Sequence, residues 1–291
     1  DPILVKFGGG CRDVEARVLE TDAGTMLIVH LLVDCRDAMG ANAVNTMCET
    51  IGPEVGELCQ GVVVLKIISN LAVHRLARVT GVFTAKELST SGDEEEGKKI
   101  INGILDAYAF AKADPFRAAT NNKGVMNAIS PIAVATGQDW RAVEAGCHSY
   151  AAYKNGSVSP FVQWSRNSDG DLVGYIEMPA PVGLIGGAAR VHPCARACVK
   201  LLGVQTATEL GTVLAAAGIA QNLGALRALA TVGIQQGHMK LHAKNLAVQA
   251  GALSKEVDAV VARATASGRV TAASIKAALD AERSGLPIPP Q

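Results

Sequence analysis

The 291-residue chain is 49% hydrophobic and 19% charged, and its formal net charge at pH 7 is zero. This length favours about two domains, and the apolar content is enough to fill a core, which excludes an intrinsically disordered chain. Lysine and arginine are scattered along the chain, which argues against a nucleic-acid-binding surface. The seven cysteines are odd in number and irregularly spaced. We therefore expect reduced thiols and a cytoplasmic location rather than a disulfide framework.

We expect neither a metal site, nor a signal peptide, nor a transmembrane span. His192, Cys194 and Cys198 have no second pair at the spacing of a zinc site, so we interpret them as helix-packing residues. The alanine-rich stretch Thr212–Thr231 is long enough to cross a membrane, but three polar residues interrupt it. That pattern predicts a buried helix.

The N-terminal quarter of the chain predicts a compact α+β unit. Residues 14–19 and 26–33 are rich in β-branched and aliphatic residues, and Thr21–Gly24 between them is typical of a hairpin turn. Residues 37–58 predict a helix with one apolar face. Residues 61–68 then predict a buried strand.

The helix of this unit begins with small residues around Gly40. Free backbone N–H groups and the positive end of a helix dipole suit a phosphate group. The segment is not the GxGxxG fingerprint, and the strand alternation of a doubly wound sheet is missing. Two interpretations stay open at this point: a phosphate site, or a glycine that only makes a tight turn.

From Ala77 onward the pattern predicts longer helices. A polar turn at 89–96 leads into a helix with Ile101, Leu105 and Tyr108 on its buried face, and this helix ends near Asp114-Pro115. Beyond Asp139 we predict a helix over 140–153 and strands at 158–163 and 172–178.

The stretch from Ala119 to Asp139 places one lysine, Lys123, directly after a turn-like cluster of asparagines. A lysine beside amides and a glycine can be held near a substrate oxygen as a fixed positive charge. The alternative is a solvated start of a helix, because loops favour these residues. After Lys123 we expect a helical patch of apolar residues and then a second polar turn that ends in Asp139.

The region from about Val232 to the C-terminus predicts helices. His238 and His242 lie four residues apart on one helix face, but no HExxH arrangement accompanies them, so a zinc site is disfavoured. The glycine-rich segment 183–187 permits close backbone approach, either to a ligand or to a packed helix.

Five segments together resemble the hydroxymethylglutaryl-CoA reductase family in its bacterial class II form. They are DAMGANAVNTM at 37–47, NKGVMN at 122–127, ATGQDWRAVEAG at 135–146, EMPAPVGLIGG at 177–187 and GHMKLHAKN at 237–245. Their order along the chain is the family's order, and they span most of it.

The resemblance implies an α+β fold with three parts. A small ferredoxin-like nicotinamide-cofactor domain would occupy 1–72, inserted in a larger domain whose N-terminal part is absent. A mostly helical substrate and CoA domain with a short sheet would occupy 73–231, and a C-terminal helical flap 232–291. The cofactor would be NADH, with NADP possible. The residues implied to contact it are Asp37, Ala38, Met39, Gly40, Asn42 and Asn70, together with Asp1, whose carboxylate would accept from a ribose 2′-OH and repel a 2′-phosphate.

The reaction implied is the interconversion of HMG-CoA with mevalonate and CoA through two hydride transfers. Lys123 would supply the cation at the carbonyl oxygen, and Asp139 would form a hydrogen bond with Lys123 and tune it. His238 would protonate the departing CoA thiolate, and Arg117 would hold a substrate carboxylate with Asn127 as a polar neighbour.

The family also uses a catalytic glutamate in an N-terminal motif that does not occur in this chain, which begins at Asp1-Pro2. We expect that glutamate upstream of Asp1. A homodimer or higher homo-oligomer with a shared active site is expected as well. The alternative function is a truncated, non-catalytic CoA- or nucleotide-binding form of the same fold.

Overall fold

The computed structural model describes residues 2–231, 234–266 and 270–284, and within α10 it describes side chains only from His242 onward. The chain divides into two compact units, Asp1–Gly224 and Ala225–Gln291. The first unit carries both sheets, and the described part of the second is helical. The predicted α+β class is confirmed.

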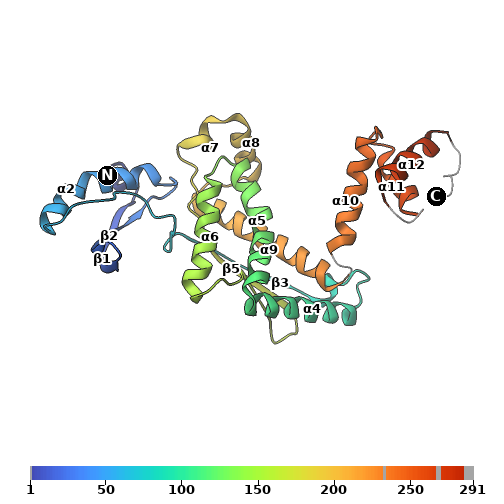
Figure 1. Ribbon diagram of the computed structural model, residues 1–291, viewed down its shortest axis with the longest axis horizontal. Helices are drawn as coiled ribbons and strands as arrows, with labels where there is room; N and C mark the ends of the chain where they lie inside the picture. The colour runs from blue at the N-terminus through green and yellow to red at the C-terminus, as the bar shows by residue number, and fades with distance from the viewer. Residues whose placement is uncertain (1, 232–233, 267–269, 285–291) are drawn as a thin grey trace. The chain divides into compact units, whose positions relative to one another are not determined.

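The first unit begins with a β-hairpin and a helix, as predicted (Figure 1). After the short helix α1 (Pro2–Lys6), β1 (Gly10–Thr21) pairs antiparallel with β2 (Gly24–Asp34), and Thr21 lies opposite Gly24. Gly24 has a φ of 105°, which only glycine adopts freely, and this explains the tight turn. Helix α2 (Ala41–Leu58) follows.

The predicted buried strand at 61–68 is wrong. The segment forms no strand, and Val62, Val64 and Leu65 are 91%, 74% and 79% exposed. A run of β-branched residues becomes a strand only when another strand supplies the hydrogen bonds. Here β1 and β2 pair with each other, and within the described residues they form a two-stranded sheet.

The second sheet of this unit is three-stranded and antiparallel, with the order β3-β5-β4. Its first strand, β3 (Leu76–Phe83), lies where the sequence predicted helices from Ala77 onward, and that prediction is wrong. The predicted strand 172–178 is confirmed as β5 (Leu172–Pro179), whereas the one at 158–163 lies four residues later, as β4 (Val162–Arg166). Short helix α3 (Ala85–Leu88) leaves the sheet with a capping box at Thr84.

Three long helices follow one another along the chain: α4 (Glu94–Ala113), α5 (Pro115–Ala135) and α6 (Trp140–Asn155). The start of α5 is specified by Asp114, whose side chain accepts from the Arg117 amide, and by Pro115 in the first turn. The turn-like cluster predicted at Asn121–Gly124 is therefore inside a 21-residue helix. Polar residues tolerate that position because their side chains find tertiary partners, which are described below.

The remaining helices of the first unit are α7 (Gly187–Val191), α8 (Pro193–Leu202) and α9 (Ala207–Ala230), the last of which extends past Gly224. Among the described helices, α9 alone is long and apolar enough to cross a membrane, a test that core helices of soluble proteins also pass. One face of α9 is fully buried, with Leu210, Leu214 and Leu226 at 0% exposure.

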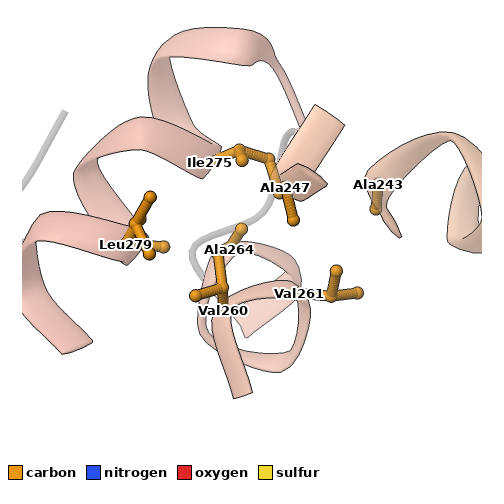
Figure 2. Close-up of a cluster of buried hydrophobic side chains, with 8 residues drawn as sticks. Ala243, Ala247, Val260, Val261, Ala264, Ile275 and Leu279 are labelled. Carbon is orange, nitrogen blue, oxygen red and sulfur yellow. The ribbon is translucent and has the colours of Figure 1, made fainter. Parts of the chain in front are cut away.

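The second unit has its own apolar core. It is built by α10 (Ile234–Gln249), α11 (Val257–Ala266) and α12 (Ala272–Ser284). Figure 2 shows side chains of this core, which is rich in alanine and valine. Small side chains at these positions let the three helices approach closely. Its buried members are Ala243, Ala247, Val260, Val261, Ala264, Ile275, Ala278 and Leu279.

Candidate functional site

Lys123 lies at an open pocket of about 250 Å³ that residues of α5 and α6 line. Because successive turns of a helix align residues three and four apart, Lys123, Asn127 and Ser130 share one face of α5. Glu144 of α6 lines the same pocket, and its carboxylate accepts from the Ser130 hydroxyl at 3.3 Å. The pocket thus brings together one cation, one amide and one carboxylate. Its lining residues are Lys123, Met126, Asn127, Ser130, Pro131 and Glu144.

Two asparagines immediately before Lys123 anchor this turn of α5 in the core. Asn121 and Asn122 are 4% and 1% exposed. Asn121 accepts from Asn222 of α9, and Asn122 bonds the backbone of Ser159 and Phe161. The lysine that follows them is exposed. The turn therefore holds Lys123 at the surface while its neighbours fix the helix.

Asp139 is the N-cap residue of α6. Its carboxylate caps α6 by accepting from the Ala142 amide at 3.0 Å. Lys123 lies 12 residues before the end of α5, which is about 18 Å along the helix axis. The predicted hydrogen bond between Lys123 and Asp139 is therefore absent from the described chain. A catalytic role for Asp139 stays a prediction, and Glu144 is the carboxylate that the structure brings to the pocket.

Arg117 lies in the first turn of α5. Six residues before Lys123, it is turned by about 120° around the helix and displaced by about 9 Å along it. Arg117 is partly buried, and its guanidinium forms no ion pair with a described carboxylate. The ordinary ion pair that would compete with a substrate carboxylate is thus not formed within the described residues.

The predicted cofactor-binding segment, residues 37–42, leads into the N-terminus of α2, where the first backbone amides have no side-chain cap. Gly40 is the N-cap of α2 with a φ of 104°, and no side chain caps the helix. Three amides, those of residues 41–43, consequently precede the first intrahelical bond, from Val44 to the Gly40 carbonyl. No acidic residue lies in the first turn. Phosphate oxygens of a nucleotide fit this arrangement. Asn42 is exposed there.

The same turn is clamped to the rest of the first unit. Asp37 accepts through its carboxylate from the Ala207 amide at the start of α9, at 2.7 Å, and through its carbonyl from the Leu184 amide at 2.8 Å. Ala38 forms a parallel bridge with Ile185. A side chain on Gly183 would overlap the Met39 backbone nitrogen. Asp37, Ala38 and Met39 are thus held by the glycine-rich loop, and this explains why that loop needs glycine at 183.

Arg75 also holds this turn in place, and no pattern in the sequence indicated that role. Its guanidinium donates to three carbonyls, of Arg36 at 2.9 Å, Met39 at 3.3 Å and Val182 at 2.7 Å. Burial lowers the pKa of Arg75 from its usual value. Gln138 also escaped sequence reasoning: its side-chain amide pairs with both backbone groups of Gly183. An arginine in a linker carries no pattern that distinguishes it from a surface residue.

The other predicted site residues are Asn70, Asp1 and His238. Asn70 is exposed, and its carbonyl lies where a side chain on Gly146 of α6 would approach to 2.8 Å. Asp1 lies outside the described residues. His238 belongs to α10 in the second unit, but its side chain also lies outside the described residues.

Glu177 on β5 is the centre of a cluster of charges beside α6. It accepts from Lys154 at 2.6 Å, from Tyr150 at 2.7 Å and from Arg78 at 2.5 Å. The hydrogen bond from Lys154, followed by that from Tyr150, lowers the pKa of Glu177 to about 2. Burial, together with the Glu177 carboxylate, raises the pKa of Tyr150 to about 12. The cluster fixes the end of β5, from which the glycine-rich loop departs.

The two small antiparallel sheets, the pocket between helices and the open N-terminus of α2 define a mixed α+β protein whose candidate site is carried by helices. A family model described as hydroxymethylglutaryl-coenzyme A reductase matches residues 3–243. The chain belongs to the hydroxymethylglutaryl-coenzyme A reductase family.

Individual relatives agree with this assignment. The chain is 54% identical over 284 residues to the 3-hydroxy-3-methylglutaryl-coenzyme A reductase of Archaeoglobus fulgidus, covering 98% of this chain and 63% of the relative. It is 35% identical over 256 residues to a probable reductase of Borreliella burgdorferi, covering 84% and 56%. The chain thus spans less than two thirds of the length of these curated relatives.

A solved structure shows the same fold. The class II reductase of Streptococcus pneumoniae, bound to NADPH in open conformations, matches with a TM-score of 0.76 at 39% identity, over 97% of this chain and 67% of that one. A second structure of the S. pneumoniae enzyme gives the same TM-score and identity. The predicted class II form is confirmed.

Proposed function

We propose that the protein interconverts HMG-CoA with mevalonate and CoA, using a nicotinamide cofactor as the hydride carrier. The observation that carries the proposal is the pocket in which Lys123 and Asn127 face Glu144, in a chain 54% identical to the A. fulgidus reductase. A lysine fixed at the surface by two buried asparagines can stay close to a substrate carbonyl. A positive charge held there lowers the energy of the alkoxide that forms during reduction.

The cofactor fits the open N-terminus of α2, where residues 41–43 present amides to its phosphates. Gly40 is needed there because a side chain would overlap Cys35. When bound, it supplies or accepts the two hydrides of the four-electron exchange. The S. pneumoniae structure contains NADPH, which supports a nicotinamide cofactor. We keep NADH as the preferred form, on the chemistry of the Asp1 carboxylate alone.

Each proposed site residue of the chain has a separate role in this reaction. Lys123 polarises the thioester carbonyl and later the aldehyde carbonyl. Asn127 donates to or accepts from the substrate beside it, and Arg117 holds the carboxylate at the far end of the acyl group. His238 gives its proton to the CoA sulfur as the thiolate leaves. Asp139 is the proposed group for proton transfer.

A spectrophotometric assay of the full-length protein tests the proposal. We expect oxidation of NADH that depends on HMG-CoA, and in reverse, reduction of NAD that depends on mevalonate and CoA. Lys123→Ala should lower kcat by about 10²–10³-fold, the cost of removing one group that stabilises an oxyanion. Lys112→Ala, an exposed lysine of α4, is the matched control and should leave kcat unchanged.

Two results would count against the proposal. Full kcat in folded Lys123→Ala would remove Lys123 from the mechanism. A wild-type protein that binds CoA or nucleotide without turnover would favour the non-catalytic alternative. For the cofactor, equal kcat/KM with NADH and NADPH would contradict the preference for NADH.

We also propose a homo-oligomer in the cytoplasm. The apolar side chains exposed on the first unit, among them Phe116 at 83% and Leu201 at 88%, are candidates for a subunit contact. All seven cysteines are free, as expected in a reducing compartment. Light scattering coupled to size-exclusion chromatography measures the assembly, and a monomeric mass would refute the oligomer.

A further inference from the structure

A line of buried hydrogen bonds joins the three-stranded sheet to the turn of α5 that carries Lys123. The indole N–H of Trp164, on β4, donates to Asn222 of α9 at 2.8 Å. The amide of Asn222 donates to the Asn121 side-chain oxygen on α5 at 3.0 Å. The three side chains are 4%, 2% and 4% exposed, respectively.

The far end of this line is fixed by packing. A side chain on Gly174 of β5 would approach the Trp164 ring to 2.6 Å, so the ring lies directly on that strand. Phe83 of β3 lies beside it, with ring centroids 6.1 Å apart. The indole therefore has little freedom to turn, and its N–H direction sets the orientation of the Asn222 amide.

A second anchor acts on the neighbouring residue. Asn122 donates to the Ser159 carbonyl at 2.7 Å and accepts from the Phe161 amide at 3.0 Å. Adjacent helical residues point about 100° apart, so Asn121 and Asn122 are held from two directions. Two such restraints fix both the rotation of α5 and its position along the axis at this turn.

We propose that Asn222, acting through Asn121, is a positioning residue for Lys123. The inference rests on the function proposed above, because it assigns the network a purpose only if Lys123 acts on the substrate. Rotation of α5 by a small angle would carry the long lysine side chain away from its place opposite Glu144 of α6. Misplacement of a reacting group by about 1 Å can cost about 10²-fold in rate.

The chemistry of the network favours positioning over simple stabilisation. Two buried amides gain little net free energy over an apolar pair of the same shape, because both must lose water. They add direction, since a satisfied polar network accepts only one arrangement. Apolar packing already joins the helices, because a side chain on Gly218 of α9 would meet Ile129 and Val125 of α5 at 3.0 and 3.1 Å.

The test is a double-mutant cycle on kcat in the full-length protein. Asn222→Ala and Asn121→Ala should each lower kcat by about 10- to 100-fold. The KM for the nicotinamide cofactor should stay within about twofold, because its turn at Gly40 is bonded elsewhere. The double variant should be no slower than the slower single variant, since both remove the same connection.

Asn102→Ala is the matched control. Asn102 on α4 accepts a hydrogen bond from Arg166 of β4, so the control also removes one amide bond to that strand while leaving α5 untouched. It should keep wild-type kcat. Melting temperatures are measured for every variant, and kinetics are run well below the lowest of them.

One readout does not need activity. The chain has two tryptophans, and Trp140 is 43% exposed, so the two indole ¹⁵N–H signals are easily told apart. The Trp164 signal should shift in Asn222→Ala and stay in Asn102→Ala. If Asn222→Ala does not fold, Trp164→Phe keeps the ring and removes the N–H, and it should still lower kcat.

The outcomes separate the inference from the proposed function. Wild-type kcat in folded Asn222→Ala or Trp164→Phe, or additive losses in the double variant, would overturn the positioning role while Lys123→Ala remains inactive. An inactive wild-type protein would instead remove the proposed function, and the inference with it.

Discussion

Replacing Glu177 by glutamine should destabilise the first unit by an amount that depends on pH. The pKa of this carboxyl is lowered from 4.5 to about 2, chiefly by the hydrogen bonds from Lys154 and Tyr150. A difference of about 2.5 between the two pKa values corresponds to about 3.4 kcal/mol. The side chain of Glu177 is 11% exposed, but those of Lys154 and Arg78 are 41% and 58% exposed. Because solvent screens both cations, we expect a loss of about 1.5 kcal/mol at pH 7.

The sign follows from the lowered pKa in the folded state. The carboxylate contributes its full stability above about pH 4.5 and loses it as the pH falls toward 2. The difference between wild type and Glu177→Gln should therefore be constant from pH 7 to pH 5. It should shrink below that range, be mostly lost near pH 2 and vanish below it.

Urea denaturation followed by tryptophan fluorescence measures this difference. Trp164 lies on β4, which pairs with the strand that carries Glu177, so its emission reports on the relevant sheet. Glu95→Gln is the control. Glu95 is 73% exposed, and its one ion pair among the described residues is with Lys98, so we expect a loss of less than about 0.5 kcal/mol. A Glu177→Gln difference that stays unchanged down to pH 2 would refute the electrostatic reasoning.

Three further predictions concern the clamp and the thiols. Gly183→Ala places a methyl group on the Met39 nitrogen, so the KM for the nicotinamide cofactor should rise about tenfold or more in steady-state kinetics, and an unchanged KM would refute the close approach. Asp37→Ala removes the hydrogen-bond acceptor of the Ala207 amide, so the free energy of unfolding in urea should fall by about 1 kcal/mol. Asp37→Asn keeps an acceptor and should cost less. Equal losses in the two variants would contradict this capping role. Burial raises the pKa of Cys147 to about 12, so mass spectrometry after a brief thiol-labelling reaction at pH 7.5 should find it unmodified, and early modification would show that its helix opens. The exposed thiols that should react first are Cys11, Cys59 and Cys194.

The sequence predicted those parts of the fold that local pattern determines. The hairpin at Thr21–Gly24 and the helix after Asp139 were confirmed because turn glycines and N-caps act within a few residues. The strand at 61–68 was wrong and β3 was missed, since pairing with a strand far along the chain decides both. The partner of β3 is β5, almost 100 residues later.

In the candidate site, too, the sequence predicted what local pattern determines and missed what distant contacts determine. Lys123 could be singled out because a motif carries it, and Gly40 because small residues open a helix. The sequence could not show that Asp139 is used as a helix cap while Glu144 reaches the pocket. Nor could it reveal Arg75, whose three carbonyl partners lie in two separate segments.

Helix α9 contacts both the turn at Asp37 and the turn of α5 that carries Lys123. Its first amide, of Ala207, is held by Asp37 beside the cofactor turn, and Asn222, 15 residues later and about 22 Å along the axis, bonds the asparagine that precedes Lys123. The helix therefore fixes the distance between the turn at Asp37 and the turn of α5 that carries Lys123. Inserting or deleting one residue between Ala207 and Asn222 would put the two ends out of phase by about 100°, so the two contacts could not both form.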